Sequence, residues 1–160
     1  MGIAEADSAE HGSPSKELLI TPVACPMPDR SAGAPKLSGR SLVRIERGSR
    51  LARLYGLANG SSPCTGEIEE EYFCNYEVNP DYRREFKQGG LSITATGDTG
   101  EVRAIEIPGH RFYIATLFQP QLSSTHDTPH PIVLGFLGCA AGRAHRRLIK
   151  LRPWLDRSNP

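Results

Sequence analysis

Apolar and polar residues alternate in several short stretches of the chain, and this pattern predicts strands. The alternation is regular over 41–45 and over 91–96. Gly97-Asp98-Thr99-Gly100 separates the second stretch from another alternating stretch at 101–107, which predicts a β-hairpin. The run at 112–118 is almost wholly apolar, as is typical of a central strand covered on both faces.

Two further stretches are expected to be extended. Residues 18–24 form a short apolar run that predicts a strand, although Pro22 weakens the pattern. After the turn at Gly48-Ser49, residues 50–55 are interpreted as a second short strand following 41–45.

Two segments carry helix signals. Asn79-Pro80-Asp81 combines a capping side chain, a proline suited to the first helical position and an acidic residue, and Gly89-Gly90 ends the segment. A last helix is expected to start near His130-Pro131, with His130 packing or capping at its start. The residues expected on its core face are Val133, Phe136, Leu137 and Ala140.

Strands, helix, hairpin, strand and helix in this order predict an α/β fold. The 160 residues suffice for about one domain, which we place at 1–142. The segment 143–160 carries six Lys and Arg residues against one Asp and is predicted to be a basic, disordered tail.

Charge and cysteine content narrow the function classes. Nineteen Lys and Arg against eighteen Asp and Glu give a net charge of +1, which argues against nucleic acid and membrane surfaces as partners. The acidic run Glu69-Glu70-Glu71 is expected to be exposed. The amino-terminus lacks signal-peptide character, and four scattered cysteines indicate reduced thiols in a cytoplasmic protein. Neither a metal site nor a cofactor is expected, and the oligomeric state stays open.

Several motifs then occur in a familiar order. Tyr76-Glu-Val-Asn79 follows an acidic run and precedes a predicted helix, with Ser49-Arg-Leu-Ala-Arg-Leu-Tyr-Gly56 before it and Phe118-Gln-Pro-Gln121 after it. This series resembles the C-terminal glutaminase region of CTP synthase, a class I glutamine amidotransferase. The resemblance implies part of a flavodoxin-like α/β domain, a mixed sheet with flanking helices whose front half is missing.

A smaller group is similar in finer detail. Cys74-Asn75-Tyr76 and Phe118-Gln-Pro resemble the CTP synthase C-terminal region-related proteins, some of which are selenoproteins. The resemblance implies a pocket for a small, glutamine-like molecule that involves Cys74, Asn75, Tyr76 and Phe118.

The residues that the family uses for catalysis are replaced. The family's His base and its orienting Glu fall on Gln119 and Gln121, and an amide does not accept a proton near neutral pH. No Gly-x-Cys-x-Gly nucleophile turn occurs in the chain, and 71–75 carries no cation for a substrate carboxylate. We therefore expect that this chain does not hydrolyse glutamine, in contrast to the family's role in pyrimidine nucleotide synthesis.

Three readings of the function remain open at this point. The chain is a degenerate or N-terminally truncated glutaminase domain, a fragment of a seleno- or thiol-based redox enzyme with Cys74 near an upstream nucleophile, or a non-catalytic binding or regulatory module. Truncation would follow if a selenocysteine codon were taken as a stop and the chain assigned from the next Met. The alternative is a natural domain without its front half.

Overall fold

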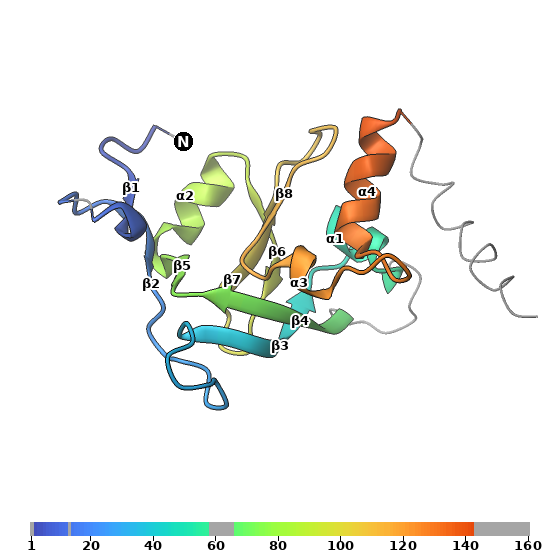
Figure 1. The fold of residues 1–160 in the computed structure, drawn as a ribbon. Helices are drawn as coiled ribbons and strands as arrows, with labels where there is room; N and C mark the ends of the chain where they lie inside the picture. Colours follow the sequence, from blue (N-terminus) through green and yellow to red (C-terminus); the bar gives the residue numbers. More distant parts are fainter. Residues whose placement is uncertain (1, 13, 58–65, 143–160) are drawn as a thin grey trace, which may run out of the picture.

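The larger of two sheets forms the centre of the structure, a computed structural model that describes residues 2–12, 14–57 and 66–142 (Figure 1). Its strand order is β4-β3-β6-β7-β8, and each neighbouring pair is antiparallel. The strands are β3 (Leu37–Ile45), β4 (Gly66–Cys74), β6 (Ser92–Thr96), β7 (Val102–Glu106) and β8 (Ile114–Thr116).

The smaller sheet has three strands in the order β1-β2-β5. These are β1 (Asp7–Ser8), β2 (Leu18–Pro22) and β5 (Tyr76–Val78), and a 3₁₀ turn, η1 (Ala9–His11), follows β1. β1 pairs with β2 in parallel, whereas β2 and β5 are antiparallel. The expected strand at 18–24 is thus confirmed, and it ends at Pro22, which lacks the N–H needed to continue a ladder.

Strands β3 and β4 pair along their full length. The register runs from Leu37 opposite Cys74 to Ile45 opposite Gly66. The strand predicted at 41–45 is confirmed and begins four residues earlier. This pairing fixes which β4 side chains face the core, because successive residues of a strand point to opposite faces.

The first predicted helix and the hairpin are confirmed. Asn79 Oδ1 accepts the Asp81 N–H at 3.1 Å and starts η3 (Pro80–Tyr82), which runs directly into α2 (Arg83–Gln88). α2 ends at Gly89 and buries Phe86. β6 and β7 then pair across the turn at 97–100, as expected.

The segment predicted as a strand at 50–55 is instead a helix, α1 (Arg50–Leu54). Ser49 Oγ accepts the Ala52 N–H at 2.9 Å, and the Glu106 carboxylate accepts the N–H groups of Arg50 and Leu51 at 3.0 and 2.8 Å. The second cap comes from a residue more than fifty positions away, so local alternation could not reveal it.

The prediction of a central strand at 112–118 is also wrong. β8 spans only Ile114–Thr116, lies at the edge of the five-stranded sheet and is half-buried. The apolar run is longer than the strand because it also includes Phe118, which follows the edge strand and is buried in the core.

The last helix, α4 (Pro131–Ala140), starts at His130 as expected, and His130 Nδ1 accepts the Ile132 N–H at 3.2 Å. Its expected core face is wrong, because Phe136 and Leu137 are 54% and 55% exposed. The buried residues are Ile132, Gly135 and Gly138. A Cβ on Gly135 would come within 2.4 Å of Leu54 Cδ2, so the glycine face lets α4 approach α1 closely.

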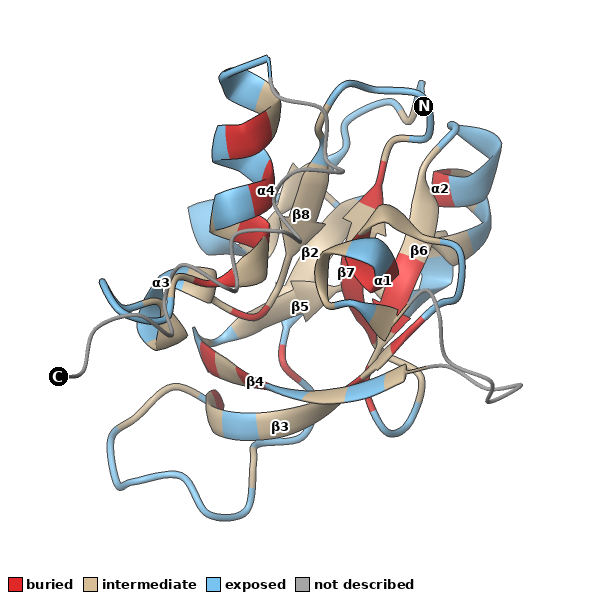
Figure 2. Ribbon diagram, turned by 90° about the vertical axis from the view of Figure 1, so that its right-hand side faces the viewer, coloured by how far each residue is buried: buried red, intermediate tan, exposed pale blue. Residues whose placement is uncertain are grey.

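The hydrophobic core lies between these elements (Figure 2). Its largest fully buried side chains are Tyr72, Phe118, Ile45, Leu51 and Val43. Tyr72 and Phe118 meet edge to face, with ring centroids 6.2 Å apart. A short helix, α3 (Pro120–Ser123), follows Phe118 and packs near β4. No helix of the described ranges is long and apolar enough to span a bilayer.

A buried polar cluster joins α1, β4 and α4. Tyr55 donates its hydroxyl to Glu70, and His130 Nε2 lies 3.0 Å from the Tyr55 oxygen and 3.1 Å from Glu70 Oε1. The expectation that Glu69-Glu70-Glu71 is an exposed run is wrong at Glu70, which is only 5% exposed. Alternation along β4 turns Glu70 inward together with Tyr72, while Glu69 faces solvent.

Replacing Glu70 tests this cluster. Glu70→Ala leaves the Tyr55 hydroxyl and the His130 ring without their shared acceptor, so we expect the free energy of unfolding to fall by about 2–3 kcal/mol. Glu69→Ala, on the exposed face of the same strand, should change it by less than about 0.5 kcal/mol. Urea unfolding of both variants measures the difference, and equal effects would contradict the assigned cluster.

The same cluster predicts a loss of stability in alkali. Burial and the hydrogen bond to Glu70 raise the pKa of Tyr55 well above its usual value. The unfolded chain therefore releases this proton near pH 10 while the folded chain retains it, and stability falls above that pH by about 1.4 kcal/mol per pH unit. Tyr55→Phe should reduce this slope by about that amount and leave the part that buried Tyr72 contributes, because burial raises the pKa of Tyr72 as well. Tyr113→Phe, at an exposed ring, should leave the slope unchanged.

Candidate functional site

The predicted site residues meet at the C-terminal end of β4. Phe118 is 1% exposed and packs against Tyr72 below this end, and the chain then turns so that the Gln119 N–H donates to the Glu71 carbonyl at 2.8 Å. Pro120 suits the first position of α3 and starts the helix directly after Gln119. Packing and one backbone hydrogen bond therefore place Gln119 beside the strand end.

The two glutamines form a chain of amide hydrogen bonds. Gln119 Nε2 donates to the Phe73 carbonyl at 2.9 Å, and Gln121 Nε2 donates to Gln119 Oε1 at 3.4 Å. The side chains thus interact with each other, as a base and its orienting carboxylate would. Both groups are neutral amides, however. They fix each other's position by hydrogen bonds, but neither is basic enough to accept a proton near neutral pH.

Cys74 is the last residue of β4, and its thiol is half-buried. Its sulfur accepts the Tyr76 N–H at 3.4 Å. Cys25 and Cys139 are also free thiols, and Cys64 lies outside the described residues. The structure therefore places one accessible thiol at the strand end that also holds the glutamine pair.

Asn75 and Tyr76 continue the chain into the smaller sheet. Asn75 Oδ1 accepts the Lys36 N–H at 2.9 Å, and its carbonyl accepts the Val23 N–H at 2.8 Å. Tyr76 is half-buried opposite Pro22. In this arrangement Asn75 ties the loop before β3 to the strand end, and its side-chain oxygen is engaged.

The cations next to the strand end are also engaged. Arg40, on β3, pairs with Glu71 across the strands at 3.5 Å. Lys36 Nζ donates to the Val23 carbonyl at 2.9 Å. To pair with one of these cations, the carboxylate of a bound small molecule would have to displace an existing contact. Residues 71–75 themselves offer no cation.

Sequence reasoning missed two buried charges behind the site, Glu70 and Arg103. Arg103 lies on β7, 3.7 Å from Glu77 and 3.4 Å from Glu101, with its guanidinium 5.4 Å from the Tyr72 ring centroid. Period-two alternation in β4 could have identified Glu70, but nothing local marks Arg103 as buried. Within the described ranges, no group of three His, Cys, Asp or Glu side chains could hold a metal ion.

Comparison with known proteins places this arrangement in context. The chain is 28% identical over 141 residues to CTP synthase of Saccharolobus solfataricus and 32% identical over 114 residues to that of Methanopyrus kandleri. These matches cover 88% and 71% of this chain but only 25% and 20% of the relatives. No family model matches the chain.

A solved structure agrees with the sequence matches. The glutaminase domain of Trypanosoma brucei CTP synthase with bound acivicin superposes with a TM-score of 0.74 at 29% identity. The match covers 90% of this chain and 53% of the solved chain, so this chain spans about half of that domain. By sequence and by fold, the chain belongs to the glutamine amidotransferase domains of the CTP synthase type.

Proposed function

We propose that this chain is a degenerate glutamine amidotransferase domain of the CTP synthase type, which binds a small glutamine-like molecule but does not hydrolyse glutamine by itself. The observation that carries the proposal is the amide pair Gln119–Gln121 at the end of β4. The relatives are CTP synthases, so the proposed context is pyrimidine nucleotide synthesis in the cytoplasm.

The amide pair removes the acid–base step. Hydrolysis of an amide by a thiol needs a base that takes the thiol proton and then delivers it to the leaving amine. The Gln119 side chain donates from Nε2 to the Phe73 carbonyl and accepts at Oε1 from Gln121 Nε2. These hydrogen bonds fix its position, but the amide does not act as a base. The amide oxygens and N–H groups still suit recognition of a polar small molecule by hydrogen bonds.

A weak site for a carboxylate is expected for an electrostatic reason. Residues 71–75 carry no cation, and Arg40 already pairs with Glu71. Recognition of an amino acid would then depend on neutral donors and on Tyr76 at the edge of the site. Because hydrogen bonds to charged partners are about twice as strong as neutral ones, glutamine itself should bind weakly.

Glutaminase activity gives the direct test. The chain incubated with L-glutamine should release no ammonia above the buffer rate, because a proton acceptor is lacking at position 119. Gln119→Ala serves as the matched variant, and circular dichroism establishes that both are folded. Ammonia release by the unmodified chain that disappears in Gln119→Ala would contradict the proposal.

A second candidate, a thiol-based redox reaction, is favoured by Cys74 alone. Its half-buried sulfur lies at the end of β4, where it accepts the Tyr76 N–H at 3.4 Å. Thiolates are the reactive form of cysteine. The candidate therefore predicts a thiol more reactive than its half-buried position suggests.

Site-resolved alkylation tests this second candidate. With iodoacetamide at neutral pH, a redox thiol at Cys74 should be modified faster than Cys25, although Cys25 is exposed. Mass spectrometry of peptides from a single sample compares the two rates with Cys25 as the internal control. Slower modification of Cys74 than of Cys25 would identify it as an ordinary half-buried cysteine and remove the candidate.

A further inference from the structure

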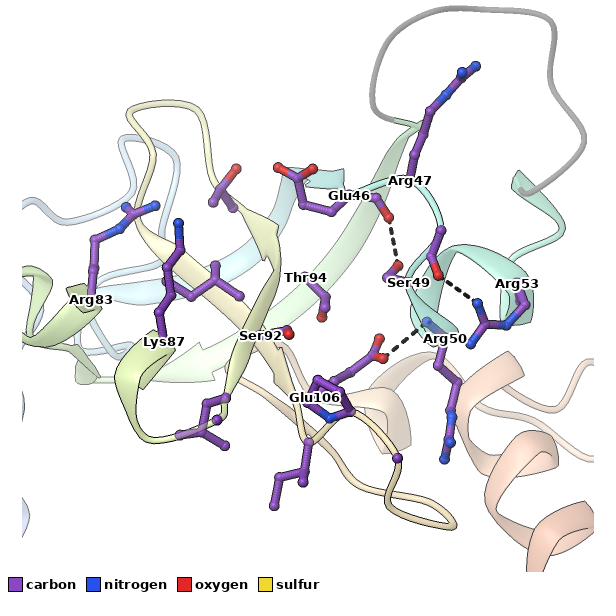
Figure 3. Close-up of a pocket in the computed structure, with 18 residues that line it drawn as sticks. Glu46, Arg47, Ser49, Arg50, Arg53, Arg83, Lys87, Ser92, Thr94 and Glu106 are labelled. Atoms are coloured by element: carbon purple, nitrogen blue, oxygen red, sulfur yellow. Dashed lines mark hydrogen bonds between the residues drawn. The ribbon is translucent and has the colours of Figure 1, made fainter. Parts of the chain in front are cut away.

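A large hollow lies on the sheet away from the glutamine pair. It has a volume of about 890 Å³ and is bounded by the turn before α1, by α2, and by β6 with the end of β7. Figure 3 shows Arg83 and Lys87 on the α2 side, Ser49 and Arg53 on the α1 side, and Thr94 between them. The volume is within the range of small-molecule sites, about 300–1,000 Å³. None of its lining residues belongs to the candidate site at the end of β4.

Most of the charged side chains around the hollow are cationic. The charged lining residues are Arg47, Arg50, Arg53, Arg83 and Lys87 against Glu46 and Glu106. The chain as a whole has a net charge of only +1, so this local excess of positive charge is a property of the hollow. A concave surface lined by one sign of charge concentrates counter-ions of the other sign.

The acidic residue in the floor, Glu106, is already engaged by hydrogen bonds. The Glu106 carboxylate is buried and accepts the N–H groups of Arg50 and Leu51 at 3.0 and 2.8 Å. Its charge therefore stabilises the start of α1. Glu46 is exposed at the rim, so the α2 side of the hollow presents Arg83 and Lys87.

The floor also contains an unpartnered hydroxyl. Thr94 lies on β6 and is 4% exposed, yet its Oγ1 has no hydrogen-bond partner. Buried polar groups in native structures are nearly always hydrogen-bonded, so an exception calls for a partner. Ser92, two residues earlier on β6, also lines the hollow. A ligand oxygen seated here would satisfy the Thr94 hydroxyl.

Lys87 is the cation best suited to a ligand. It lies four residues after Arg83, so both side chains share one face of α2. Within the described ranges the Lys87 ammonium has neither an ion pair nor a hydrogen bond, whereas the Arg83 guanidinium donates one of its N–H groups to the Gly100 carbonyl. The Arg83 guanidinium has further N–H donors, so Arg83 and Lys87 together can bind an anion in the hollow that Thr94 also lines.

We propose that this hollow binds a small phosphate-bearing molecule. Lys87 and Arg83 neutralise the phosphate, and the Thr94 hydroxyl donates to a ligand oxygen. The compact, concave shape and the near-zero net charge of the chain favour a small molecule over a nucleic acid strand, which needs an extended basic surface. This proposal stands apart from the glutaminase-like site, because the two sites share no residue.

Calorimetric titration of the full chain with inorganic pyrophosphate at low salt tests the proposal. We expect saturable binding at one site, weakened about tenfold or more by Lys87→Glu, since a charge-assisted contact is replaced by a repulsive one. Arg84→Glu is the matched control, because Arg84 is an exposed neighbour on α2 that does not line the hollow. It carries the same change in net charge and should alter the affinity less than about twofold.

Thr94→Val provides a second, independent readout. It should weaken pyrophosphate binding several-fold without lowering the Tm of the free protein, because the hydroxyl makes no hydrogen bond in the unliganded structure. No saturable binding by the folded chain would overturn the proposal, as would equal weakening by Lys87→Glu and Arg84→Glu. Binding of a single-stranded RNA oligomer in preference to pyrophosphate would overturn it too, by indicating a nucleic acid surface.

Discussion

The hydrogen bonds of the buried Glu70 carboxylate to Tyr55 and His130 are the interaction on which the packing of α1, β4 and α4 depends. Glu70 lies on β4, accepts the Tyr55 hydroxyl that follows α1, and contacts His130 at the start of α4. A buried charge is tolerated only when its hydrogen-bonding capacity is met, so this residue fixes how three elements come together. The glycine face of α4 then packs closely on α1.

The same strand connects this scaffold to the candidate site. β4 points Glu70 and Tyr72 into the core and ends with Phe73 and Cys74. At this end the Phe73 carbonyl accepts a hydrogen bond from Gln119 Nε2. The position of the glutamine pair is therefore set by the strand and by Phe118 beneath it. An amide side chain can occupy such a position without accepting a proton near neutral pH.

The two proposed sites use different parts of one sheet. The glutamine pair lies at the end of β4, whereas the basic hollow lies over β6 between α1 and α2 (Figure 3). Glu106 connects the hollow to the core, since its carboxylate caps α1 from β7. A ligand in the hollow would therefore contact elements that Glu70 and Glu106 hold in place, and both carboxylates are buried.

The sequence by itself determined the elements whose signals are local. The cap at Asn79, the stop at Gly89-Gly90, the 97–100 hairpin and the His130 helix start each depend on neighbours within a few residues, and all four are present. The ordered motifs around Tyr76–Asn79 also sufficed to indicate the family, whereas the assignment of Gln119 and Gln121 to the family's catalytic positions stays a prediction.

Tertiary structure alone decided the features that join distant parts of the chain. Glu106 adds a long-range cap to the local Ser49 cap at the start of Arg50–Leu54. β8 lies at the edge of its sheet, and its apolar run does not encode this place in the strand order. α4 is apolar on all sides, so only the close approach to Leu54 selected its glycine face. The burial of Glu70 and the gathering of cations around Thr94 likewise depend on long-range packing, which local patterns do not contain.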